Sequence, residues 1–429
     1  MVSRKRKVKR KINIKKVIFF IAVLLIIVLG IVFGVSKLLN SSSNKPENKV
    51  INTKKYTYIK YGSTNNKTNI YIKNNNKFDN IGSIEKGIKL EFSEIDKNYL
   101  KINGFDNQYY IKAENINKED AIDEIDNRYK NYIVFNENVV TNDKTSFYNE
   151  DGNLLYTINN SYDLPIIVKD NDRYGVEFNN RLVYVNKNDV KETKNNNNTN
   201  KTNASGVGVL NYHFFYDDSI ANNDGCNEDI CISKSQFTSE LEYLKNNNIF
   251  PIMSKELEWY IDGKIQLPKS VYITIDDGAR TKIAVDLLKE YKYYATIFLV
   301  TSWFDPNNYY TNEYIELHSH TDNMHNQGDC PTGQGGGIQC LDKNKILSDL
   351  QKSQDKLGGS NVIAYPFYEY NDYSIEVLKE AGFTMAFAGE STYSDNLVHV
   401  GSNKYELPRF IMVNYTTKND LDRYFNNIT

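Results

Sequence analysis

The 429-residue sequence has little tryptophan, little histidine and almost no net charge. It contains 2 tryptophans, 5 histidines, 52 basic residues and 54 acidic residues. Without a basic excess, the overall charge gives no reason to expect nucleic-acid binding. Because histidines are so few, the places where they occur are informative. The length predicts two or three domains.

Basic charge is concentrated at the N-terminus, where Lys and Arg dominate residues 4–16. Val17 to Val35 is then an unbroken run of apolar residues and glycine, long enough to cross a bilayer as a helix. The basic block should remain cytoplasmic, which places everything after Ser36 outside. A cleaved signal peptide is the alternative, but its apolar core would be about 7–15 residues. We therefore expect residues 1–35 to form a cytoplasmic tail and single-pass anchor in the cell membrane.

The cysteines are also few, and an even number of them follows the expected anchor within one region. In an oxidising compartment an even count favours two disulfides. A zinc cluster is the alternative, but the spacings do not form paired CxxC motifs. We expect two local pairs, which are Cys226 with Cys231 and Cys330 with Cys340.

The first half of the exterior chain indicates two small all-β modules. Residues 36–50 are a polar linker, and residues 51–119 and 130–192 contain short alternating strands separated by Asn/Gly turns. A helix is expected only near 120–130. Both segments end in a hydrophobic strand and a closing turn, which is similar to the bacterial SH3-like modules of cell-envelope proteins. They serve either as spacers or as wall-binding units.

Residues 193–206 form a polar, low-complexity linker with nothing to bury. From residue 207 to 429, strands alternate with helices, which predicts an α/β domain with a parallel sheet. Its size suits a distorted or incomplete (β/α) barrel, whose active site lies at the C-terminal ends of the strands. The expected strands are 207–213, 249–253, 271–276, 294–300, 314–319, 361–367, 384–388 and 409–413, and the expected helices are 234–247, 280–291, 342–357, 372–381 and 417–427.

The expected strand ends carry aspartates and histidines, which can bind metal ions or transfer protons. Strand 271–276 leads into Asp276, Asp277 and Gly278, where glycine permits a sharp turn. Four of the five histidines fall at the ends of strands 207–213 and 314–319. Imidazole and carboxylate together suit zinc and similar divalent ions, and one Asp with two His leaves positions open for water and substrate.

Three motifs in this order resemble those of the polysaccharide deacetylase family, also called the NodB-homology group or carbohydrate esterase family 4. They are Thr274 to Gly278, His320 to His325, and Ala364 to Phe367, and the resemblance covers about residues 207–429. The opening segment from Val209 to His213 and the closing Leu407 to Phe410 are similar to the branch that deacetylates poly-N-acetylglucosamine or wall glycans.

The resemblance implies a role for each matching residue. Asp276 corresponds to the general base, and the Phe367 N–H corresponds to the oxyanion donor. The metal ligands would be Asp277, His320 and His325. Many members space the two histidines four apart, which here would select Met324, so His318 is a second candidate ligand. Pro366, Tyr368 and His213 are expected to bind substrate.

Two departures from the family pattern require substitutes. Ala364 stands where the third motif usually begins with Arg, so Arg409 is the candidate for the positive partner of Asp276. Asn414 lies near the position of the final histidine, the general acid, for which His399 or His213 is the candidate replacement. The aromatic residues near the site, which include Trp303, Phe304, Tyr309, Tyr310, Tyr365 and Tyr368, are candidates for stacking on sugar rings.

These observations predict a metal-dependent hydrolase that removes N-acetyl groups from cell-wall glycan and releases acetate. The anchor and the SH3-like modules favour peptidoglycan, as N-acetylglucosamine or N-acetylmuramic acid. The histidine spacing favours a poly-N-acetylglucosamine exopolysaccharide instead, and a non-catalytic glycan-binding protein is a third hypothesis. The expected ion is zinc, with cobalt, nickel or manganese as alternatives. We expect a monomer with an extracellular catalytic domain and no nucleic-acid partner.

Overall fold

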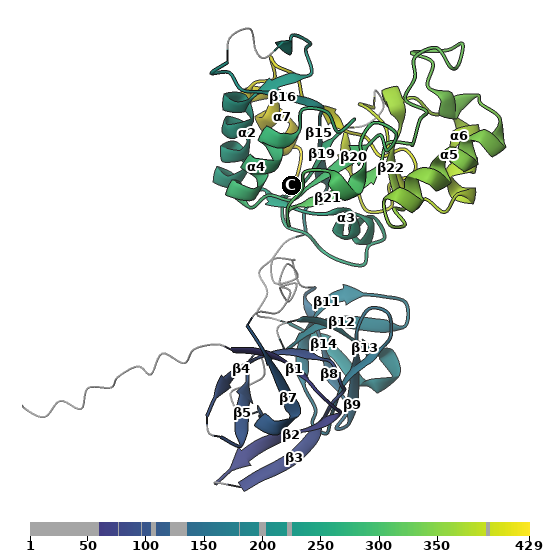
Figure 1. Ribbon diagram of the computed structural model, residues 1–429. Coiled ribbons are helices and arrows are strands. Elements are labelled where there is room, and N and C mark those ends of the chain that lie inside the picture. Colours follow the sequence, from purple (N-terminus) through teal and green to yellow (C-terminus); the bar gives the residue numbers. More distant parts are fainter. Residues whose placement is uncertain are drawn as a thin grey trace, which may run out of the picture. The chain divides into compact units, whose positions relative to one another are not determined.

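The structure is a computed structural model that describes residues 60–429, apart from 76, 96, 104–108, 121–134, 180, 197–202, 221–224 and 392–394 (Figure 1). Within these residues, no helix is long and apolar enough to span a membrane. The predicted anchor at 17–35 lies outside the described residues, as does most of the helix expected near 120–130.

The first part of the described chain is all β, as expected. Its strands are antiparallel and join into one 14-stranded sheet, β14-β8-β11-β12-β13-β9-β10-β3-β2-β6-β5-β4-β1-β7. They are β1 (Lys60–Thr64), β2 (Thr68–Asn74), β3 (Lys77–Ile84), β4 (Lys89–Glu94), β5 (Tyr99–Ile102), β6 (Tyr109–Lys112), β7 (Ile116–Glu119), β8 (Glu137–Thr141), β9 (Thr145–Tyr148), β10 (Leu154–Ile158), β11 (Asp163–Lys169), β12 (Arg173–Phe178), β13 (Arg181–Asn186) and β14 (Val190–Asn195).

The two predicted modules share a sheet and a core. Strand β3 of the first pairs with β10 of the second, with Ile84 opposite Tyr156 and Gly82 opposite Ile158. Both sets of strands contribute to one cluster of buried side chains, which contains Ile84, Tyr156 and Ile158. This continuity is a tertiary contact, so the period-2 alternation within each strand did not reveal it.

The second part of the described chain is an α/β domain whose sheet is curled into a half-barrel, in agreement with the predicted incomplete (β/α) barrel. Parallel strands run in the order β23-β22-β21-β20-β19-β15, with β24 antiparallel at the end. β18 and β25 add short parallel pairs to β19 and β15. The strands are β15 (Val207–Tyr212), β18 (Phe250–Pro251), β19 (Ser270–Ile275), β20 (Ala295–Leu299), β21 (Ile315–Ser319), β22 (Val362–Ala364), β23 (Met385–Phe387), β24 (Leu397–Val398) and β25 (Phe410–Ile411).

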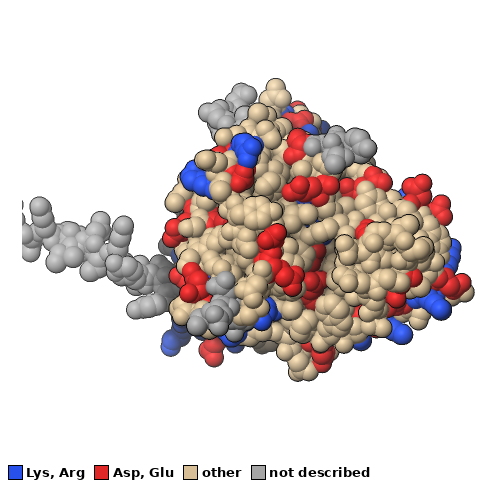
Figure 2. Space-filling model, turned by 90° about the horizontal axis from the view of Figure 1, so that it is seen from above, with Lys and Arg blue, Asp and Glu red and all other residues tan. Residues whose placement is uncertain are grey.

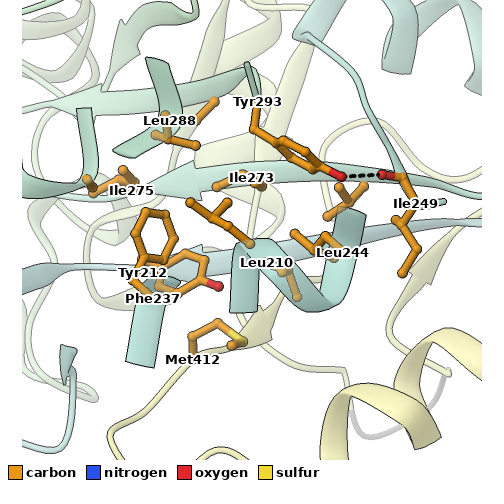
Figure 3. Packing of buried hydrophobic residues seen from close by; sticks show 14 of the residues in the cluster. Leu210, Tyr212, Phe237, Leu244, Ile249, Ile273, Ile275, Leu288, Tyr293 and Met412 are labelled. Atoms are coloured by element: carbon orange, nitrogen blue, oxygen red, sulfur yellow. Dashed lines mark hydrogen bonds between the residues drawn. The ribbon is translucent and has the colours of Figure 1, made fainter. Parts of the chain in front are cut away.

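Helices cover this sheet close to where the periodicity predicts them. They are α2 (Lys234–Asn246), α4 (Lys282–Tyr291), α5 (Lys343–Lys356), α6 (Asp372–Glu380) and α7 (Lys418–Asn426). Figure 3 shows how Leu210 and Ile273 from adjacent strands pack with Leu288 of α4, and how the Tyr293 hydroxyl donates to Ile249 O at 3.0 Å. Strands β15 and β19 are buried at every residue, which explains why most of their residues are apolar.

Three local features differ from the prediction. Helix α3 (Ser254–Ile261) was not predicted; it is only eight residues long and is capped by Glu256, which accepts from Met253 N at 2.8 Å. Among the described strands, the short β16 (Phe214–Tyr216) and β17 (Cys231–Ser233) pair only with each other. Strand β22 ends at Ala364 rather than at residue 367, because a 3-10 turn begins at Pro366, which has no N–H for a sheet.

Both predicted disulfides are present. Cys226 bonds to Cys231, and Cys330 bonds to Cys340. Each closes a short loop beyond the C-terminal end of a strand, after β16 in one case and after β21 in the other. Local pairing confirms the interpretation of the cysteines as disulfides rather than as a zinc cluster.

Candidate active site

The site is built on the turn that follows β19. Asp276 and Asp277 are 1 % and 7 % exposed. Asp277 has φ 68°, and Gly278 follows with φ 91°. A Cβ on Gly278 would lie 2.4 Å from the Leu299 side chain, so only glycine allows this close approach. The turn directs both carboxylates to the C-terminal edge of the sheet.

Two histidines from the segment after β21 meet the Asp277 carboxylate. Asp277 Oδ1 lies 3.4 Å from His320 Nε2 and 3.1 Å from His325 Nε2. The three ligand atoms all lie within 4.8 Å of one another. Hence residues separated by more than forty positions in the chain converge, as the sequence motifs require.

The structure also explains the unusual spacing of the histidines. Met324, at the position where many family members have the second histidine, is 3 % exposed and packs in the core with Ile338 and Ile346. Thr321 adopts φ 71° and accepts from Met324 N at 3.2 Å. This turn sends Met324 inward and brings His325 to Asp277.

The three residues have the chemistry of a divalent-metal site. His320 Nδ1 lies 2.9 Å from Ala364 O, so this nitrogen carries the hydrogen and leaves Nε2 as the ligand. Asp277 Oδ1 is buried and lacks a hydrogen-bond donor of suitable geometry among the described residues. Burial raises the pKa of Asp277, but the neighbouring imidazoles of His320 and His325 outweigh burial and lower it far below its usual value. A buried, ionised oxygen facing two imidazole nitrogens fits a cation such as zinc.

Asp276 is held by a different partner. Arg409 is completely buried, and its Nη1 donates to Asp276 Oδ1 at 2.7 Å while its Nε donates to Ala388 O at 2.7 Å. Burial alone would raise the pKa of Asp276, but the charge of Arg409 outweighs this effect and lowers it. Asp276 is therefore an anion beside the three candidate metal ligands, and Arg409 occupies the place predicted for its positive partner.

The third motif forms a strained turn. The backbone of Phe367 and Tyr368 adopts φ values of 58° and 63°, which residues other than glycine rarely adopt. The Phe367 ring lies 4.4 Å from the His325 ring, measured between centroids. Pro366 is buried. Such strain persists only where the surroundings fix it, and it is concentrated at functional sites.

His213 and Tyr368 complete the wall near Asp276. His213 Nε2 lies 4.0 Å from Asp276 Oδ2 and 3.3 Å from the Tyr368 hydroxyl, which donates to Asn211 Oδ1 at 2.8 Å. Burial lowers the pKa of His213, and the negative charge of Asp276 opposes this effect. Asn211 was not predicted as a site residue. Its signal in the sequence is one amide in an otherwise apolar buried strand.

The remaining candidates lie elsewhere. His399 contacts Ser205 O and Asp395, next to the start of β15. A six-residue strand separates that end of β15 from the site, a distance of about 20 Å. His318 is turned to Ser254 and Ser360, at 3.1 and 2.8 Å, rather than to Asp277. Asn414 contacts Glu228 O.

The aromatic candidates divide into two groups. Trp303 is 48 % exposed, and its ring lies 5.1 Å from that of His325, so it remains available to a sugar. Tyr365 is buried and donates to Tyr405 O at 3.0 Å, while Tyr309 donates to Gly278 O at 2.6 Å. Tyr310, although 48 % exposed, donates to Asp286. Phe304 packs against the core.

Comparison with known proteins agrees with this geometry. A family model described as polysaccharide deacetylase matches residues 264–386. The poly-β-1,6-N-acetyl-D-glucosamine N-deacetylase of Staphylococcus aureus strain MRSA252 is 30% identical over 203 residues, which cover 42% of this chain and 67% of that protein.

Two solved structures were also found to be similar. A de-N-acetylase from Aggregatibacter actinomycetemcomitans has a TM-score of 0.44 at 23% identity, covering 51% of this chain and 99% of that chain. IcaB from Ammonifex degensii has a TM-score of 0.42 at 19% identity, covering 52% and 96%. From the sequence match, the chain belongs to the polysaccharide deacetylase family and is an N-deacetylase hydrolase.

Proposed function

We propose that this enzyme removes acetyl groups from a poly-N-acetylglucosamine exopolysaccharide and releases acetate. The observation that carries the proposal is the convergence of Asp277, His320 and His325 beside the ionised Asp276. The Staphylococcus aureus relative supports the choice of polymer. The exopolysaccharide was the alternative hypothesis from the sequence, and peptidoglycan becomes the second candidate.

The reaction uses the residues already described. A divalent cation bound by Asp277, His320 and His325 would activate a water and polarise the acetamide carbonyl. Asp276 accepts the proton of the attacking water, and Arg409 keeps this carboxylate oriented. The Phe367 N–H donates to the developing oxyanion, a contact worth about 3–4 kcal/mol in comparable sites.

We assign the general acid to His213 rather than to His399. His213 lies beside Asp276, whereas His399 lies at the opposite end of β15. Its buried Nδ1 has no hydrogen-bond partner among the described residues, so this imidazole is not committed to a structural contact at that atom. In its protonated form, His213 would donate to the leaving amine.

The surroundings of the site favour a neutral or cationic glycan. A pocket of about 600 Å³ adjoins the site through Tyr368, and its described lining includes Glu390 and Glu406 but no lysine or arginine. Figure 2 shows acidic side chains gathered along a hollow on the face seen from above. Exopolysaccharide that is losing acetyl groups gains ammonium groups, whereas peptidoglycan stems carry carboxylates. This charge pattern supports the first candidate.

The location of the enzyme is part of the proposal. The basic tail and the apolar run at 17–35 support a single-pass membrane anchor with the catalytic domain outside. The two disulfides support an oxidising compartment. The chain would then act as a monomer at the cell surface, with the all-β modules as spacers or wall-binding units.

The proposed chemistry is tested with Asp276→Asn. We expect acetate release to fall at least about 100-fold, because the base is lost, while the protein retains one divalent ion per chain. Glu376→Gln, an exposed change on α6, is the control and should leave the rate unchanged. Acetate release by Asp276→Asn at the wild-type rate would refute the assignment of the base.

The polymer is tested by supplying wild-type protein with two substrates in parallel. One is a β-1,6-linked N-acetylglucosamine oligosaccharide, and the other is purified peptidoglycan. We expect acetate from the first and little from the second. Acetate from peptidoglycan alone would transfer the proposal to the second candidate, and release from neither would contradict both.

A further inference from the structure

Glu369 lies two residues beyond the proposed oxyanion donor and has an unusual set of hydrogen bonds. Its Oε2 accepts from Gly336 N at 2.9 Å and from Gln339 Nε2 at 2.8 Å, and its Oε1 accepts from Gln334 N. All three donors belong to the loop closed by the Cys330–Cys340 disulfide. The Glu369 carboxylate therefore holds this loop in place, although the loop lies about thirty residues earlier in the chain.

The loop is shaped around this carboxylate. A Cβ at Gly333, where φ is 60°, would lie 1.8 Å from Glu369 Oε1. A Cβ at Gly336 would lie 3.2 Å from Glu369 Oε2, 3.4 Å from Pro366 O and 3.5 Å from Phe367 Cδ2. The glycines therefore let the loop backbone approach both Glu369 and the turn that precedes it.

That turn requires an anchor. Phe367 and Tyr368 are consecutive left-handed residues, and each such conformation costs about 1–2 kcal/mol in a residue with a side chain. The upstream end is fixed by the sheet, through Tyr365 N donating to Phe387 O at 3.0 Å. The downstream end is fixed by Glu369, whose N–H donates to Pro366 O and whose carboxylate binds the loop.

The same loop is continuous with a metal ligand. His325 precedes Cys330 by five residues, and its ring contacts that of Phe367. The chain therefore runs from the proposed metal ligand His325 into the disulfide-closed loop. This loop then contacts the turn that carries the proposed oxyanion donor. It connects two parts of the site that belong to different strands.

We infer that Glu369 is a positioning residue that fixes the Phe367 N–H through the Cys330–Cys340 loop. The inference rests on the proposed role of Phe367. The carboxylate does not contact the reacting atoms. It acts by fixing the conformation of the turn at Phe367 before substrate binds. The disulfide contributes because it holds the three donors in one place. Glu369 and the Cys330–Cys340 loop together thus form a clamp on the turn at Phe367.

The test is Glu369→Gln, which keeps the shape but replaces one acceptor oxygen by an amide that faces N–H donors. A displaced oxyanion donor lowers kcat without weakening substrate binding, and loss of such a donor costs about 100-fold or more. We expect kcat on the β-1,6-linked oligosaccharide to fall about 10- to 100-fold, with KM within about twofold and metal content unchanged. Glu376→Gln is again the matched control.

A second variant keeps the test decisive if the first is unstable. Cys330→Ser with Cys340→Ser should show the same loss of kcat, and combining it with Glu369→Gln should add little, because both act through one clamp. Additive losses, or a rise in KM with kcat intact, would overturn the inference. Failure of the wild-type protein to release acetate would instead count against the proposed function.

Discussion

Arg409 shows how one buried residue supports the chemistry of another. It is the positive partner of Asp276 although 133 positions separate them, and it fills the role that Ala364 cannot. Its guanidinium is also held by Ala388 O and lies 5.3 Å from the centre of the Tyr368 ring. The pair is thus fixed from several sides, which suits the proposed role of Asp276 as a base that must be held in one orientation.

Replacing Arg409 by Met should therefore destabilise the protein as well as inactivate it. Breaking a buried ion pair from one side costs about 3–5 kcal/mol, because a buried charge loses its partner. We expect a loss of this size in chemical denaturation. The double variant Arg409→Met with Asp276→Asn should recover part of the loss. Equal destabilisation of the single and double variants would show that packing, not charge, causes the effect.

Glu240 provides a separate prediction on pH. It is 5 % exposed, accepts from the Tyr212 hydroxyl at 3.0 Å, and has its pKa raised by burial to about 7 from 4.5. Native protein binds this proton more tightly than unfolded protein does. The resulting stabilisation is complete below about pH 4.5 and is lost as the pH rises through about 7. The change is on the order of 3 kcal/mol at most.

This prediction is checked by the free energy of unfolding between pH 4.5 and 8. Wild-type protein should lose more stability across this interval than Glu240→Gln, which cannot ionise. Glu242→Gln, on the same helix but outside the buried cluster, should follow the wild type. If wild type and Glu240→Gln have the same slope, the raised pKa is not a property of the folded protein.

Among the elements, the pairing of β3 with β10 makes the all-β region one continuous sheet. It joins two sets of strands that the sequence presents as separate modules. Gly82 lies at this junction, and a Cβ there would come within 2.2 Å of Thr157 O. The junction therefore depends on a position without a side chain.

Gly82→Ala should separate β3 from β10. Because backbone atoms block the added methyl, we expect a loss of about 1–3 kcal/mol and faster amide hydrogen exchange in both strands. Ser83→Ala, at the adjacent position, adds no atom and should leave exchange unchanged. Unaltered exchange of β10 in Gly82→Ala would show that the pairing tolerates a side chain.

For the whole molecule, we predict that the first 35 residues attach the enzyme to the membrane. Deleting them should release the enzyme from the membrane fraction, because the basic tail and apolar run supply the proposed anchor. Acetate release from a short soluble oligosaccharide should stay within about twofold, since none of the site residues lies there. The measurement is activity in membrane and soluble fractions. Continued sedimentation with membranes would contradict the anchor.

The sequence by itself determined the α/β class of the catalytic domain, the positions of its main helices, the local disulfides and the residues available to a metal ion. These follow from short-range patterns, because periodicity, turn residues and motif spacing are local properties. The choice of His325 over His318 does not belong here, because the motif left His318 as a second candidate, and only the structure turns His318 to Ser254 and Ser360 and brings His325 to Asp277.

Only the tertiary structure decided which distant groups meet. It placed Arg409 on Asp276, kept His213 near the site and left His399 at the other end of β15. It also joined the two β modules and brought the Cys330–Cys340 loop to Glu369. The physical reason is that these contacts depend on the curl of the sheet and the path of its loops. Neither property is encoded in the spacing of residues along a single strand or helix.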